Sequence, residues 1–208
     1  MADTTINVET VVENLKKNNF SVHVAETKEE GAQIVRSLIE KGATIGVGGS
    51  VTIEQLEILD GLEADGHLIF NHNKAGLTPQ QVLDFRRREL TSDVFLMSTN
   101  ALTEKGELVN VDGVGNRVAA LSFGPKRVIV VAGINKIVAD VHAGIARIGS
   151  IAAPMNNKRL KKDMPCTKVG HCVDCQLPGR ICNITTITKK RPPLTDIQIV
   201  LVKEELGY

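Results

Sequence analysis

All four cysteines of this 208-residue chain lie near one another, in the order Cys166, Cys172, Cys175 and Cys182. Cytoplasmic thiols stay reduced, so four thiolates on one inorganic centre are a simpler interpretation than structural disulfides. Structural zinc usually takes two C-x2-C pairs, whereas only Cys172 and Cys175 form such a pair here. Iron–sulfur clusters accept more varied spacing around a C-x2-C element. The sequence therefore predicts a 4Fe–4S cluster, with zinc as the alternative.

Basic residues surround these cysteines, because residues 156–191 contain nine Lys or Arg and only two Asp. Positive charge near four thiolates stabilises an anionic cluster. The same charge also fits a solvated face or a surface for an acidic partner protein. His171 lies between the cysteines and could replace one ligand, but with four thiols present we expect it beside the centre or at the surface.

A second concentration of polar side chains lies in residues 97–117, MSTNALTEKGELVNVDGVGNR. Apolar runs at 94–97 and 108–111 predict buried strands, and a helix is expected from Val118 onward. The polar groups therefore collect at strand ends, which is where open α/β sheets bind ligands. Ser98 and Asn100 are candidates for substrate contacts, and so is Asn116, although a helix cap or a tie within the loop is favoured for Asn116.

Two carboxylates of this stretch, Glu104 and Asp112, are candidates for catalysis. A carboxylate acts as a general base only if burial or its neighbours raise its pKa toward neutrality. Glu104 precedes Lys105 and Gly106, a pattern that equally fits an exposed turn. Asp112 precedes a glycine turn, so a helix N-cap or a tie within the loop is favoured over a ligand contact.

Two cations are placed to hold an anion. Arg117 follows the glycine turn and Lys136 closely follows a predicted strand, so both could face the same crevice. Arginine can grip a carboxylate with two parallel hydrogen bonds. The alternative for Lys136 is a solvated lysine at a strand end. His72, in a polar loop after another predicted strand, could serve as a proton shuttle or could simply be exposed.

Gly48, Gly49 and Ser50 form a glycine turn between a predicted strand and a predicted helix. The turn lacks the last glycine of the dinucleotide fingerprint and the ending of a P-loop, so neither NAD nor ATP is indicated. Its backbone N–H groups and the Ser50 hydroxyl could hold a carboxylate or phosphate. A tight turn that requires positive φ explains the glycines equally well.

Helix and strand patterns alternate along the chain, which indicates the α/β class. Right-handed crossovers then give three layers, a mostly parallel sheet with helices on both faces, plus a Cys-rich metal-binding segment. We divide the chain into an α/β domain (1–157), a Cys-rich cluster-binding segment (158–192) and a closing strand that returns to the domain (193–208). Helices are expected at 8–15, 27–39, 53–59, 78–88, 118–121 and 137–148, and strands at 21–25, 43–47, 68–70, 94–97, 108–111, 127–132 and 197–202.

Composition limits the class of protein. Hydrophobic residues make up 42% of the chain, which is enough for a core, and a net charge of +1 argues against bulk attraction to nucleic acid or membranes. No apolar run approaches the roughly 20 residues that span a bilayer, and the first residues have no secretory signal pattern. We therefore expect a cytoplasmic protein, and a homo-oligomer remains open.

The motif from Ser98 to Arg117, together with Gly133-Ile-Asn135-Lys136, resembles the LUD domain of bacterial lactate-utilisation proteins. The resemblance implies a fold like that of NagB, ribose-5-phosphate isomerase and the CoA-transferases. It also implies a part in oxidising L-lactate to pyruvate, beside partner subunits with iron–sulfur centres. In the related isomerases and transferases, an acidic residue acts as general base or nucleophile, and a glycine turn holds phosphate or CoA. By position, Glu104 resembles that acid, and Gly48, Gly49 and Ser50 resemble that turn.

Three functions follow as hypotheses. The first, which we favour, is an iron–sulfur-containing component of a lactate-oxidising system with a pocket for a small carboxylate or phosphate. The second is an isomerase-like or CoA-transferase-like enzyme that uses Glu104, with structural zinc in the tail. The third is a noncatalytic scaffold subunit. No flavin or nicotinamide motif is present, so a hydride acceptor would belong to another subunit.

Overall fold

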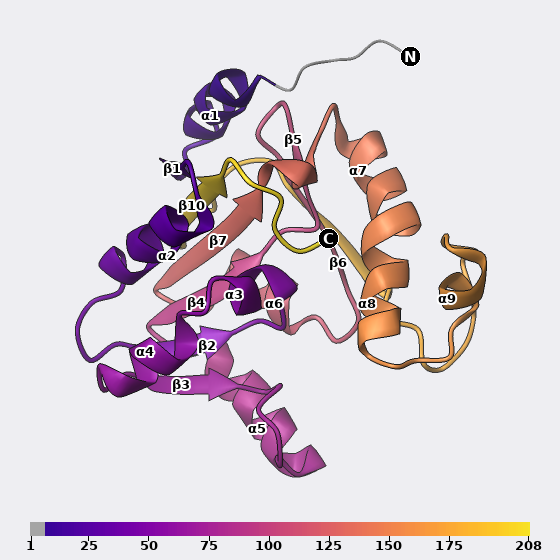
Figure 1. The fold of residues 1–208 in the computed structure, drawn as a ribbon, viewed down its shortest axis with the longest axis horizontal. Helices are drawn as coiled ribbons and strands as arrows, with labels where there is room; N and C mark the ends of the chain where they lie inside the picture. The colour runs from indigo at the N-terminus through magenta and orange to yellow at the C-terminus, as the bar shows by residue number, and fades with distance from the viewer. Residues whose placement is uncertain (1–6) are drawn as a thin grey trace.

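The computed structural model describes residues 7–208, which form an α/β fold around a six-stranded sheet. Every neighbouring pair in this sheet is parallel. Figure 1 shows the strands fanning across the molecule. Their order is β1 (Ser21–Ala25), β10 (Asp196–Val202), β7 (Arg127–Gly133), β4 (Val94–Ser98), β2 (Thr44–Val47) and β3 (Leu68–Asn71).

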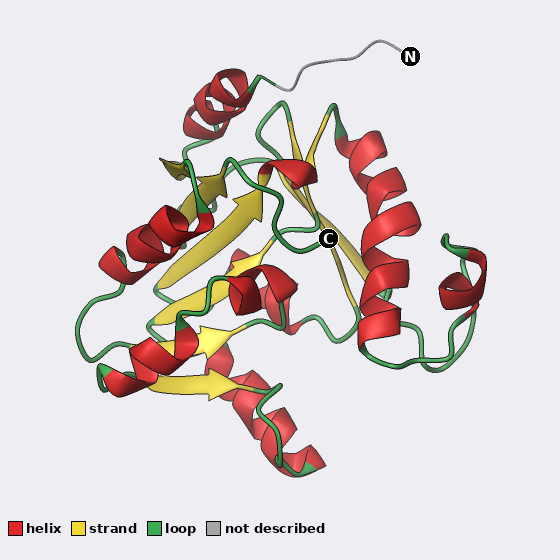
Figure 2. Cartoon of the chain, in the orientation of Figure 1, coloured by secondary structure: helices red, strands yellow, loops and turns green. Residues whose placement is uncertain are grey.

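Helices cover both faces of this sheet, as the alternating sequence pattern predicted (Figure 2). Side chains such as Leu96 and Val131 point to one face, where they pack with α2 (Lys28–Ser37), α3 (Val51–Gln55) and α4 (Leu59–Ala64). Phe95 and Val130 point to the other face, which is covered by α1 (Val8–Lys17), α5 (Pro79–Glu89) and α6 (Asn116–Ser122). The predicted three-layer architecture is therefore confirmed.

Local capping signals place the helix starts. The Asn7 side chain accepts a hydrogen bond from the Thr10 N–H, and α1 then buries Val11 and Leu15. At α5, the Thr78 hydroxyl accepts from the Gln81 N–H while the Gln81 side chain accepts from the Thr78 N–H, a complete capping box. These two helix starts were readable from sequence because capping is a local interaction.

A second, four-stranded sheet was not predicted. Its order is β8 (Ile137–Val138), β5 (Ala101–Thr103), β6 (Leu108–Asp112) and β9 (Ile184–Thr188). The helix expected to begin at Ile137 starts instead at α7 (Val141–Arg147), because residues 137–138 pair with β5. Ile145 of α7 is exposed, and Gly144 takes the inner position against Val109 and Ala101. The strands β5 and β8 have three and two residues, which are too few to show the alternating pattern of a strand. Their strand conformation therefore depends on pairing with neighbouring strands.

The helix expected over 53–59 is divided into α3 and α4. Glu57 between them has φ of 52°, a left-handed conformation that ends the first helix. Farther along, α7 continues through a π-helical turn, η2 (Ile148–Ala152), into α8 (Ala153–Arg159), and Figure 1 shows these elements as one column beside the second sheet. Pro154 cannot donate a backbone N–H, so the π turn leaves the Gly149 carbonyl free.

The Cys-rich segment leaves and rejoins this framework. After α8 the chain forms α9 (Pro165–Val169) and a loop, then pairs with β6 through β9. The closing strand, β10, lies between β1 and β7 in the parallel sheet rather than at its edge. Within residues 7–208, none of the helices combines the length and apolar character needed to cross a membrane.

Candidate functional site

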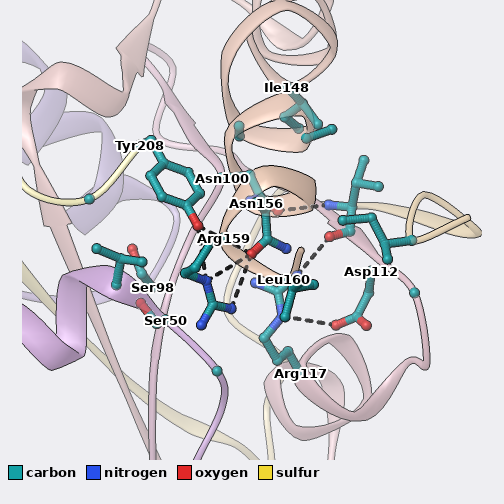
Figure 3. Close-up of a pocket in the computed structure, with 18 of the residues that line it drawn as sticks. Ser50, Ser98, Asn100, Asp112, Arg117, Ile148, Asn156, Arg159, Leu160 and Tyr208 are labelled. Atoms are coloured by element: carbon teal, nitrogen blue, oxygen red, sulfur yellow. Dashed lines mark hydrogen bonds and ion pairs between the residues drawn. The ribbon is translucent and has the colours of Figure 1, made fainter. Parts of the chain in front are cut away.

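A cavity of about 280 Å³ opens at the carboxyl ends of β2, β3, β4 and β7. We call it the strand-end cavity. Parallel strands bring these four ends to one edge of the sheet, so segments far apart in sequence meet there. Figure 3 shows side chains from several of them turned toward one another. The predicted residues that line the cavity are Gly49, Ser50, His72, Ser98, Asn100, Asp112, Asn116, Arg117, Lys136 and Cys182, whereas Gly48 does not line it.

Positive charge dominates the wall of this cavity. Among its described lining residues Asp112 is the one carboxylate, whereas five side chains are lysine or arginine, namely Arg86, Arg117, Lys136, Arg159 and Lys162. Arg86 also has a buried Nε for which the described residues provide no hydrogen-bond partner. Such an excess of donors and positive charge favours an anionic ligand.

Asp112 and Arg117 support each other at the cavity wall. The Asp112 Oδ1 accepts hydrogen bonds from the Val114 and Gly115 N–H groups, and its Oδ2 lies 3.1 Å from the Arg117 Nε (Figure 3). A second guanidinium nitrogen of Arg117 donates to the Val111 carbonyl at 2.6 Å. Asp112 is therefore the loop tie favoured from sequence, and it fixes the cation expected to hold the ligand.

Lys136 is buried, with 3% of its surface exposed, on the short 3-10 turn η1 (Ile134–Lys136) after β7. Its Nζ donates to the Thr52 hydroxyl and to the Ser98 hydroxyl, each at 2.7 Å. Burial, with smaller contributions from Arg147 and Arg117, lowers the pKa of Lys136 to about 7. The alternative of a solvated lysine is wrong.

His72 is held by Glu89, a contact that sequence reasoning missed. The Glu89 Oε1 lies 2.6 Å from His72 Nδ1 and also accepts from the His72 backbone N–H, while Oε2 accepts from the Asn116 amide. A carboxylate only accepts, so Nδ1 carries a hydrogen and Nε2 is the ring nitrogen left for a ligand. His72 lines the strand-end cavity, so the alternative of a merely exposed loop histidine is wrong.

The glycine turn is shaped by close contacts rather than by unusual backbone angles. Neither Gly48 nor Gly49 has positive φ, so that interpretation of the turn is wrong. A Cβ on Gly48 would lie 2.9 Å from Phe95 and 3.0 Å from the Arg117 side chain, so glycine there makes room for Arg117. Ser50 caps α3 by accepting from the Ile53 N–H.

Glu104 lies outside the strand-end cavity, contrary to its predicted catalytic position. It belongs to the β5–β6 turn, and its backbone carbonyl accepts a hydrogen bond from Asn14 in α1. Asn18, the C-cap of that helix, donates to the next two carbonyls, those of Lys105 and Gly106. The turn therefore anchors α1, and Glu104 is not among the residues that line the cavity.

The four cysteines line a second, smaller cavity, the cysteine cavity. None forms a disulfide, and Cys166 is buried while Cys172 is exposed. Most of the remaining wall is apolar and comes from Ala153, Met164, Val173 and Ile181. Within residues 7–208, no three His, Cys, Asp or Glu side chains form a group placed to hold a metal ion.

Hydrogen bonds hold the cysteine loop against α8. The Cys172 N–H donates to the Gly149 carbonyl at 2.7 Å, which is the carbonyl left free beside Pro154. The Asn157 amide donates to the Cys166 Sγ at 3.3 Å, and the Asp174 N–H donates to the Cys172 Sγ at 3.4 Å. Arg180 donates to the Cys175 and Cys182 carbonyls, closing the far side of the loop.

The two cavities share a wall made by Ala153, Ile181 and Cys182. Burial raises the pKa of the Cys182 thiol to about 11, and the nearby cysteines add to the rise while Arg180 opposes it. Thiols that raise one another's pKa in this way are close in space. A cation or cationic cluster core would relieve that repulsion.

Known proteins share the fold of this chain. A sequence model of the LUD domain matches residues 8–202. The crystal structure of a DUF162 family protein from Deinococcus radiodurans matches with a TM-score of 0.52 and 14% identity, over 95% of this chain and 99% of that chain, so the fold is shared. Ribose 5-phosphate isomerase A from Neisseria gonorrhoeae matches over 56% of this chain and 57% of that chain, with a TM-score of 0.34 and 13% identity. No curated protein matches the sequence.

Proposed function

Because the chain belongs to the LUD domain family, which is associated with lactate utilisation, we propose that it is an iron–sulfur component of a system that oxidises L-lactate to pyruvate. In this proposal Cys166, Cys172, Cys175 and Cys182 hold one 4Fe–4S cluster, and the strand-end cavity binds a small carboxylate. The protein works in the reducing cytoplasm with partner subunits, where its thiols stay available.

The shared wall between the two cavities is the observation on which this proposal depends most. Cys182 lines both of them, so a centre held by this thiol would adjoin the ligand. A structural metal has no need to adjoin a ligand pocket, whereas an electron carrier does. This adjacency supports a redox role over a folding role for the tail.

The donor set fits a cluster better than a single zinc ion. Four free thiols line one cavity. A cluster core is larger than one ion and is held by four cysteine thiolates. The two N–H donors directed at Cys166 and Cys172 sulfurs are of the kind that stabilise anionic sulfur. When bound, the cluster would accept and release single electrons.

The chain's own residues would bind and orient the acid. Arg117 is fixed by Asp112 and Val111, so its guanidinium is preorganised to receive a carboxylate. Arg159 is similarly held by the Asn156 amide oxygen and the Tyr208 hydroxyl (Figure 3). His72, with Nε2 available and Nδ1 held by Glu89, would accept or return the proton of a substrate hydroxyl.

The enzyme alternative based on Glu104 is not favoured, because that carboxylate lies outside the cavity. Metal analysis after anaerobic purification separates the remaining possibilities. We expect about four irons and about four acid-labile sulfides per chain, with broad absorbance near roughly 400 nm. One zinc per chain and no iron would overturn the cluster, and a metal-free protein would leave the scaffold function as the better account.

A further inference from the structure

Lys136 is placed as a nucleophile rather than as a positive charge. Its Nζ contacts two neutral hydroxyls, those of Thr52 and Ser98, and no described carboxylate lies within ion-pair distance. A neutral amine has two N–H bonds, and these two hydroxyls accept both of them. The lone pair of Nζ is then left without a partner among the described residues, in a side chain that lines the strand-end cavity.

The charged groups around Lys136 all favour the uncharged amine. Arg117 approaches from α6 and Arg147 from α7, and both are cations. Asp112, the one Asp or Glu among the described lining residues, is already paired with Arg117. Arg147 gives its own hydrogen bonds to the Asn135 and Asn100 carbonyls. With a pKa of about 7, roughly half of the Lys136 side chains are unprotonated at neutral pH.

From this arrangement we infer that Lys136 forms an imine with the carbonyl carbon of a 2-oxo acid whose carboxylate is held by Arg117. The inference rests on the anion-binding role proposed for the strand-end cavity. The bond from Nζ to the carbonyl carbon forms, and the carbon–oxygen bond breaks. The oxygen leaves as water with the two protons that Nζ gives up, so no oxidant or reductant is consumed.

Nearby groups supply the proton transfers that this condensation needs. The Ser98 hydroxyl, 2.7 Å from Nζ, accepts a hydrogen bond from the amine and so helps to orient its lone pair. His72 lines the same cavity with its Nε2 free of any described partner, so this nitrogen can take up a proton that Nζ releases and pass it to the departing oxygen. An amine alone would react with any accessible aldehyde or ketone. Because Arg117 holds a carboxylate beside it, the expected ligand is a small carbonyl compound that also bears a carboxylate.

Reductive trapping tests the inference on the full chain. The protein is incubated with pyruvate and sodium cyanoborohydride, digested, and analysed by mass spectrometry. We expect one saturable adduct on the peptide that contains Lys136. Excess acetate should suppress this adduct, because acetate has the carboxylate of pyruvate but lacks its ketone group. Lys136→Met should abolish it, and Lys126→Met, at an exposed lysine paired with Asp93, should retain it.

Two results would overturn the inference: adducts spread over surface lysines, or an adduct at another site that persists in Lys136→Met. Because peptide mapping of the wild-type protein locates the adduct directly, the test holds even if the variant folds poorly. Thermal shifts with pyruvate and with acetate separate this failure from failure of the proposed function. If both acids stabilise the protein and no adduct forms, the imine is refuted but the anion-binding cavity is not. If neither acid stabilises the protein, the anion-binding cavity is refuted as well.

Discussion

The Nδ1 of His72 lies 2.6 Å from the Oε1 of Glu89, and this carboxylate is fully buried, with 0% of its residue surface exposed. Glu89 accepts three hydrogen bonds, two from His72 and one from Asn116. The pair therefore joins the end of β3, the end of α5 and the start of α6 at one point. It fixes the histidine ring with Nε2 as the nitrogen available to a ligand.

Glu89→Gln should destabilise the protein despite its similar size. The side-chain NH2 of glutamine is a donor and would face the His72 and Asn116 groups that donate to Glu89. At least one buried donor would then have no acceptor. We expect the free energy of unfolding to fall by about 1–3 kcal/mol. Urea denaturation measures this loss, and ¹⁵N spectra of the His72 ring should show a change of tautomer.

Glu63→Gln is the matched control for that change. Glu63 is about half exposed and pairs with Lys74 at 3.2 Å on the surface. Exposed ion pairs contribute little, so the unfolding free energy should change by less than about 0.5 kcal/mol. If Glu89→Gln is as mild as this control, the buried pair does not organise the site.

The pKa of Lys136 predicts how stability depends on pH. Below about pH 7 the amine is protonated in both states, so its burial opposes folding in full. Between the folded pKa of about 7 and the ordinary value of 10.5, the unfolded chain binds more protons, so stability rises with pH. The slope is at most about 1.4 kcal/mol per pH unit.

Urea unfolding of the wild-type protein and Lys136→Met, compared from about pH 6 to pH 10, isolates this contribution. Groups common to both proteins cancel in the difference. The wild-type protein should gain stability relative to the variant as the pH rises above about 7. A difference that stays constant across the range would mean that Lys136 is protonated in the folded protein.

Sequence predicted the parallel sheet well because its strands and helices are long enough to repeat their own pattern. The failures lie where partners distant in sequence decide. Residues 137–138 became strand by pairing with β5, and residues 184–188 did so by pairing with β6. Burial is similarly nonlocal. Nothing near Glu89 in the sequence distinguishes it from the exposed Arg87 and Arg88 beside it.

Ligand stabilisation should depend on Arg117. Saturating pyruvate or L-lactate at about 100 Kd would add about 2.7 kcal/mol to the free energy of unfolding. Arg117→Gln removes the cation that receives the carboxylate, so this stabilisation should be lost. The variant should also be less stable without ligand by about 1–3 kcal/mol, because buried Asp112 loses its ion-pair partner.

Lys126→Gln provides the control for charge alone. Lys126 pairs with Asp93 at 2.7 Å near the amino end of β4 and does not line the strand-end cavity. Removing it lowers the net charge by the same amount but should leave the pyruvate-induced melting shift intact. A melting shift that survives in Arg117→Gln would remove Arg117 from the ligand site.

Cys172→Ser should remove most bound iron and leave the α/β domain folded. Cys172 is exposed and lies in the loop after α9, outside both sheets, so its thiol contributes little to the core. Iron analysis and circular dichroism measure the two effects. His171→Ala is the neighbouring control and should keep its iron, since four cysteines already line the cavity. Loss of the whole fold in Cys172→Ser would make the tail a structural element.

Sequence predicted only the part of the site that follows from the positions of residues relative to strands. Arg117 and Lys136 were recognisable because each follows a strand, and strand ends of a parallel sheet converge. Glu104 was misplaced because a short turn in sequence gives no sign of which element it packs against. The shared wall of Ala153, Ile181 and Cys182 joins α8 to the cysteine loop, a contact that spacing between cysteines cannot show.

Electron paramagnetic resonance of the anaerobically purified, dithionite-reduced protein tests the central claim most directly, because it reports both the cluster and its surroundings. We predict a signal of about one spin per chain from a reduced 4Fe–4S cluster, with g values that change when pyruvate is added. The change should be absent in Arg117→Gln. A reduced cluster whose spectrum is the same with and without saturating pyruvate, or no cluster signal at all, would contradict a redox centre in the wall of an acid-binding cavity.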